Sequence, residues 1–194
     1  MKKFFPVVMA SVLGFSSLVM AHGQGEAAEP AGLEELEVLW AGAFTQFRSD
    51  IRTEEGREVG DEVLGFQWTR QQDEAVLDIY EVKPNGQLGT EVYDCHLHDS
   101  AAHCNYLESR APVDYSAPAR SFKIEELLEG AKQSLILLDG RVENLADVTA
   151  LKVWQDGRDM QVRVQGTKTS FLSCHYHGAA IDCHRQRNVG ANEP

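Results

Sequence analysis

Apolar residues recur along residues 33–51 with the spacing of one helix face. They stand at positions 33, 36, 40, 43, 44, 47 and 51, which places them on one side of a helix with 3.6 residues per turn. Glu34 and Glu35 lie in the first turn, where the helix dipole favours acidic side chains. Trp40, Phe44 and Phe47 make the stripe aromatic, and we expect these rings to lie in the protein core.

The same order of elements occurs twice along the chain. A second helix is predicted over residues 122–138, and each helix is followed by four runs with the composition and alternation of β-strands. These runs cover residues 62–70, 75–83, 88–98 and 102–109 in the first half, and residues 148–155, 159–165, 167–177 and 181–187 in the second. Because short loops connect the runs, each set is predicted to form an antiparallel meander.

Cysteine and histidine are concentrated in two boxes of one pattern. Residues 95–104 read CHLHDSAAHC and residues 174–183 read CHYHGAAIDC, and together they contain all four cysteines. If each box is a hairpin, its cysteines face each other across the strands, which favours the disulfides Cys95–Cys104 and Cys174–Cys183. The cysteine count alone also allows two other disulfide patterns, in which each bridge joins one box to the other. Closing so short a loop contributes roughly 2–3 kcal/mol.

These patterns together predict an α+β fold of two similar halves. Each half is a helix packed on a four-stranded antiparallel meander, and each carries one hairpin disulfide. The doubled element order resembles that of tandem-repeat periplasmic proteins such as the β-lactamase inhibitory proteins, and of duplicated cystatin-like folds, although no signature residues of either are present. The expected organisation is a signal peptide at 1–21, a flexible leader at 22–32, a first repeat at 33–110, a linker at 111–120 and a second repeat at 121–190.

The first residues have the features of a secretory signal peptide. Lys2 and Lys3 precede a largely apolar run that ends in a cleavage site after Ala21. The run is short and interrupted by polar residues, which argues against a membrane anchor, and we expect no membrane insertion after cleavage. The prediction is a periplasmic or secreted protein, a location in which disulfides persist.

Charge narrows the choice of partners. Without the signal peptide the chain has 16 basic and 30 acidic residues, a net charge of −14. Nucleic-acid binding is therefore not expected, because phosphates require Lys and Arg. A protein partner with positive charge would be attracted at long range.

Strand alternation sorts the two boxes into faces. One face carries apolar residues and the cysteines, and we expect it to point into the core: Tyr93, Cys95, Leu97, Leu172, Cys174 and Tyr176. The opposite face carries the histidines: His96, His98 and His103 with Asp94 in the first box, and His175, His177 and His184 with Asp182 in the second. Such a set of side chains can bind Zn²⁺ or Cu²⁺. Alternatively, it is a polar surface rich in histidine, and it occurs twice because the unit was duplicated. A separate copper hypothesis concerns His22, which signal cleavage would make the N-terminal residue.

No catalytic motif is found in the sequence. There is no G-x-S-x-G, no H-E-x-x-H, no calcium loop and no phosphate loop. The leading hypothesis is a non-enzymatic protein without a cofactor that binds another protein, of the inhibitor, toxin-neutralising (immunity) or envelope-assembly type. The alternative is a protein that binds or buffers Zn²⁺ or Cu²⁺ through the histidine-rich hairpins. A third hypothesis is a hydrolase whose Ser, His and Asp come together only in the fold.

Overall fold

The computed structural model describes residues 32–55, 62–71, 74–83, 85–111, 122–139, 144–156, 159–178 and 180–186. The first half contains α1 (Leu33–Glu55), β1 (Glu62–Val63), β2 (Gly65–Gln71), β3 (Glu74–Val82), β4 (Leu88–His98) and β5 (Ala101–Arg110). The second half contains β6 (Phe122–Lys123), α2 (Ile124–Leu138), a 3-10 turn (Leu145–Asp147), β7 (Ala150–Asp156), β8 (Asp159–Gln165), β9 (Thr169–His177) and β10 (Ala180–Arg185). The predicted α+β class, the two meanders and both helices are confirmed.

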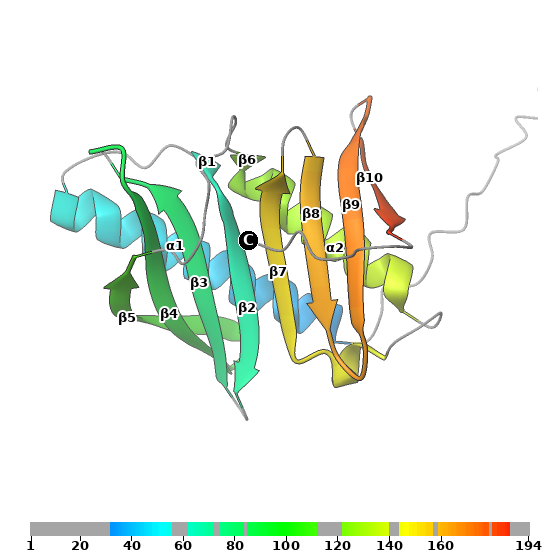
Figure 1. The fold of residues 1–194 in the computed structure, drawn as a ribbon. Coiled ribbons are helices and arrows are strands. Elements are labelled where there is room, and N and C mark those ends of the chain that lie inside the picture. Colours follow the sequence, from blue (N-terminus) through cyan, green and yellow to red (C-terminus); the bar gives the residue numbers. More distant parts are fainter. Residues whose placement is uncertain are drawn as a thin grey trace, which may run out of the picture.

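The two meanders join into one antiparallel sheet. Its strand order is β10-β9-β8-β7-β2-β3-β4-β5, so the first strand of one meander pairs with the first strand of the other. Phe66 lies opposite Val153 and Trp68 opposite Leu151 across this junction. Both helices cover the same face of the sheet (Figure 1). Corresponding elements of the two halves thus run outward from the central pair, which supports an internal duplication of the meander.

Helix α1 buries its predicted aromatic stripe against the sheet. The side chains of Trp40, Phe44 and Phe47 are at most 1% exposed. The ring of Phe66 on β2 lies 5.8 Å from the ring of Trp40 and 5.6 Å from that of Phe44. Burial of each such side chain is worth roughly 1.5–3 kcal/mol, so these contacts fix α1 over the first meander.

Several strand boundaries differ from those predicted by one or two residues, and three differences have a physical reason. Helix α1 continues to Glu55 rather than ending at position 51, because no Gly or Pro lies between Ile51 and Gly56. The predicted strand over 62–70 is split into β1 and β2. The predicted second helix loses its first two residues to β6, because Phe122 pairs with Val63 in a separate two-stranded sheet.

A glycine lets each helix approach the hairpin of its own half. In α1, a Cβ at Gly42 would overlap the Cβ of Ala102 on β5 and lie 3.5 Å from Cys104 Sγ. In α2, the carbonyl oxygen of Gly130 lies 3.7 Å from Cys183 Sγ. The absence of a side chain at Gly42 thus lets α1 approach its disulfide, and the backbone of α2 at Gly130 lies close to the other disulfide.

Two ion pairs connect the helices of the two halves. Arg48 Nη2 lies 3.0 Å from Glu125 Oε1, and Lys132 Nζ lies 3.1 Å from Glu37 Oε1. The pKa of Glu125 lies below its usual value because its own backbone N–H and then Arg48 favour the charged form. These groups are partly exposed, so the pairs orient the helices more than they stabilise them.

In the described part of the chain, every helix is too short or too polar to cross a membrane. The predicted signal peptide, nearly all of the leader, His22, most of the linker and the last residues of the second repeat lie outside the described residues.

Candidate functional site

Both predicted disulfides are present, one at the hairpin that ends each half. Cys95 is bonded to Cys104 and Cys174 to Cys183, and each pair occupies directly opposed positions of its hairpin. Both bridges contact the buried core, and Ser134 Oγ on α2 lies 3.4 Å from Cys174 Sγ. The pairings between boxes are therefore excluded, and the cysteines of the described hairpins are oxidised.

The first hairpin brings two of its histidines side by side. His96 lies opposite His103, and their ring centroids are 5.1 Å apart. His98 pairs instead with the adjacent turn, where its Nδ1 lies 3.1 Å from Asp99 Oδ2. Asp99 and Ser100 both have positive φ, the conformation of a two-residue hairpin turn. Only two imidazoles therefore come together here.

The second hairpin gathers a larger group. The ring of His175 lies 5.1 Å from that of His177 on the same strand and 5.1 Å from that of His184 on β10. Asp182 lies directly opposite His175, and its Oδ2 is 3.3 Å from His184 Nε2. Three imidazoles and one carboxylate thus occupy adjoining positions on one face of the β9–β10 hairpin.

The two histidine groups do not converge on a common site. Five strand spacings separate β4 from β9 in the sheet, and at about 4.8 Å per spacing this is roughly 24 Å. Within the residues described by the structure, no three His, Cys, Asp or Glu side chains are placed so that they could hold a metal ion. The metal hypothesis stays a prediction, and it applies to each hairpin separately.

Tyr176 departs from its predicted place in the core. It shares the inner face with Cys174, but its side chain is 41% exposed. It lies near the end of β9, beside the first turns of α2, where Glu125, Glu126 and Glu129 are polar. Strand alternation correctly placed Tyr176 on the inner face of the sheet. It could not show that the part of α2 beside this position is polar and leaves the ring exposed.

The strand β5 forms one edge of the sheet, and this feature was not predicted. Tyr106 and Leu107 on it are 43% and 53% exposed. The register with β4 shifts between Val92 and Tyr93: Val92 pairs with Glu108 and Tyr93 with Tyr106. Leu107 is therefore the extra residue of a β-bulge, which explains its exposure. The only signal in the sequence is the break in alternation caused by two adjacent large apolar residues.

The buried carboxylate of Glu91 on β4 connects to the second half of β5. Ser109 Oγ donates to Glu91 Oε1 at 2.9 Å, and Lys83 Nζ lies 3.0 Å from the same oxygen. These contacts attach the edge strand to its sheet.

Two groups near this edge have pKa values shifted by burial. Burial raises the pKa of Asp78 on the neighbouring strand β3, with the charge of Arg110 acting in the opposite direction. Burial likewise raises the pKa of Tyr93, and Asp50 adds to this effect.

No protein-family model, curated protein or solved structure matches the chain, so its function is inferred from these residues alone.

Proposed function

We propose that the chain is a non-enzymatic periplasmic or secreted protein that binds another protein along the edge strand β5. The observation that supports this is a ten-residue edge on which Tyr106 and Leu107 are exposed. Among the described residues, no strand pairs with the outer side of β5. An edge of this kind offers a row of backbone N–H and C=O groups to an additional strand.

The opposite edge of the sheet provides a contrast. The strand β10 has six residues, and Asp182, His184 and Arg185 on it are polar and exposed. Short, charged edges are a common means of preventing strand addition. The edge β5 carries a bulge at Leu107, but it is longer and has two large apolar side chains, so strand addition is more favourable there than at β10.

The chemistry of the partner follows from the same edge and from the charge of the chain. An extended segment can pair with the backbone of β5 and place apolar side chains against Tyr106 and Leu107. The net charge of the exported chain favours a segment with Lys or Arg near its apolar residues. Inhibitor, toxin-neutralising and envelope-assembly roles are all compatible with binding of this kind, which needs no catalytic residue.

Photo-crosslinking tests the edge directly. We expect p-benzoylphenylalanine in place of Leu107 to form a covalent adduct with one different protein in the cells that produce the chain. The same group in place of Lys168, which is exposed beyond the far end of β8, is the matched control and should form no such adduct. Absence of a Leu107 adduct, or an adduct only with a second copy of the chain, would contradict the proposal.

A second candidate function is metal binding by the β9–β10 hairpin. Two imidazoles bound to one tetrahedral ion, with metal–nitrogen distances of about 2.1 Å, have ring centroids roughly 5 Å apart. The two centroid distances from His175 already have this value. These spacings support the proposal, which requires the side chains to rotate so that their nitrogens point at one ion.

The two hairpins allow an internal comparison by Zn²⁺ and Cu²⁺ titration. We expect one ion per chain, and we expect combined His175→Ala, His177→Ala and His184→Ala substitutions to weaken binding at least about tenfold. Combined His96→Ala, His98→Ala and His103→Ala substitutions are the matched control and should change binding less than twofold. Equal weak binding by both triple variants and the unchanged chain would eliminate this function.

A further inference from the structure

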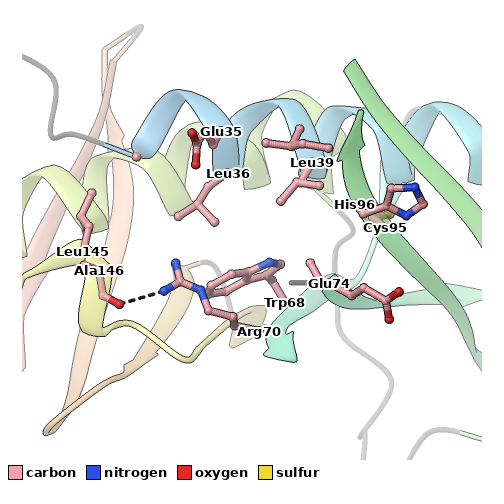
Figure 2. Close-up of a pocket in the computed structure, with 13 residues that line it drawn as sticks. Glu35, Leu36, Leu39, Trp68, Arg70, Glu74, Cys95, His96, Leu145 and Ala146 are labelled. Atoms are coloured by element: carbon pink, nitrogen blue, oxygen red, sulfur yellow. Dashed lines mark hydrogen bonds between the residues drawn. The ribbon is translucent and has the colours of Figure 1, made fainter. Parts of the chain in front are cut away.

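A cavity of about 450 Å³ lies between the first turns of α1 and the adjacent end of the sheet (Figure 2). Its apolar wall includes Leu36 and Leu39 of α1, Leu97 of β4 and Leu145 of the 3-10 turn. This volume falls within the range of small-molecule sites. Cys95 and His96 of the first hairpin also line it, whereas the histidines of the β9–β10 hairpin do not.

Trp68 places an unsatisfied hydrogen-bond donor at this cavity. Its side chain is 1% exposed, and its indole Nε1 is buried without a hydrogen-bond partner. Figure 2 shows the nitrogen on the edge of the ring that is turned toward α1. A buried N–H group without a partner costs free energy, and an acceptor atom within the cavity would remove this cost.

Arg70 lies beside Trp68 and makes the same part of the cavity polar. Its guanidinium carbon is 5.4 Å from the centroid of the Trp68 ring, and its Nη1 donates to the carbonyl oxygen of Ala146 at 2.8 Å. Its other N–H groups extend the donor surface that begins at the indole. Glu35 and Glu74 also line the cavity. An anionic ligand would meet these two carboxylates, so the cavity favours a neutral acceptor.

We propose that this cavity binds a small neutral molecule with an apolar or aromatic body and a carbonyl-type acceptor. The carbonyl oxygen accepts a hydrogen bond from Trp68 Nε1, with Arg70 beside it. The apolar body lies against the leucines of α1 and of the 3-10 turn. The site shares no residue with the edge strand β5 or with the β9–β10 hairpin.

The probe for this site is prodan, a neutral naphthyl ketone whose emission responds to hydrogen bonding of its carbonyl. Titration of the exported chain should give saturable 1:1 binding. It should also shift the indole N–H resonance of Trp68, while the resonances of Trp40 and Trp154 stay in place. Trp68→Phe keeps an aromatic ring and removes the donor, so it should weaken binding roughly three- to tenfold, the factor expected for one neutral hydrogen bond.

Trp40→Phe is the matched control. The indole Nε1 of Trp40 is also buried without a partner, but Trp40 does not line the cavity, so this variant should bind prodan within twofold of the unchanged chain. N,N-dimethyl-2-naphthylamine, which lacks the ketone, should bind both variants equally. The remaining indole resonances report whether each variant is folded. Arg70→Gln changes an exposed residue at the rim of the cavity, so we expect this variant to fold and to bind prodan more weakly. The proposal is overturned by the absence of saturable binding, by an unshifted Trp68 resonance, or by equal prodan affinity of Trp68→Phe and Trp40→Phe.

Discussion

Replacement of Cys174 and Cys183 by alanine is expected to lower the free energy of unfolding by roughly 2–3 kcal/mol. The bridge closes a loop whose ends are nine residues apart in sequence. Without it, the unfolded chain gains the conformational freedom that the bridge removes. Urea unfolding followed by circular dichroism measures the loss as a shift of the midpoint.

The equivalent replacement of Cys95 and Cys104 is the matched control. Its loop has the same length, so the expected loss is the same. The two bridges lie near opposite edges of the sheet, and the losses should add when all four cysteines are replaced. A loss below about 0.5 kcal/mol for either pair would show that the bridge does not restrict the unfolded chain as the loop-closure argument requires.

Gly42→Val is expected to destabilise the protein by about 2–3 kcal/mol. The new side chain would overlap Ala102 of β5 and crowd Cys104 Sγ, so helix and hairpin would have to separate. Such overpacking outweighs the gain in helix propensity over glycine, which is well below 1 kcal/mol for valine. Thermal unfolding of the oxidised protein measures the effect.

Gly130→Val in α2 is the matched control for this prediction. There the nearest atom to a new Cβ is Sδ of Met160, the far part of a flexible side chain that can rotate away. The expected loss is therefore smaller than at Gly42. If both variants lost the same stability, the close contact of Gly42 with Ala102 of β5 would not be what determines the destabilisation.

Local patterns were sufficient for much of the fold. The apolar spacing around Trp40 and Phe44 predicted α1, and the hairpin interpretation of the two boxes predicted both disulfides. These features depend on residues close together in sequence, whose periodicity is visible directly. The repeated box further indicated two similar halves, and the structure supports a duplicated meander.

Features that depend on distant segments could not be predicted. The pairing of β2 with β7 joins residues more than 80 positions apart, and nothing in either strand specifies its partner. The exposure of Leu107 depends on a bulge set by the register with β4. The cavity at Trp68 depends on how α1, the sheet and the 3-10 turn meet. The candidate binding edge and the cavity could therefore be identified only from the structure.

Peptide mapping under non-reducing conditions tests the central claim, two units that each close their own hairpin. Trypsin cleaves after Arg70, Arg110, Lys168 and Arg185, and Lys83 is protected by Pro84. Residues 71–110 and 169–185 should then appear as separate peptides, each two hydrogen masses lighter than its reduced form. A disulfide joining these two peptides, or masses that correspond to free thiols in the isolated protein, would contradict the account.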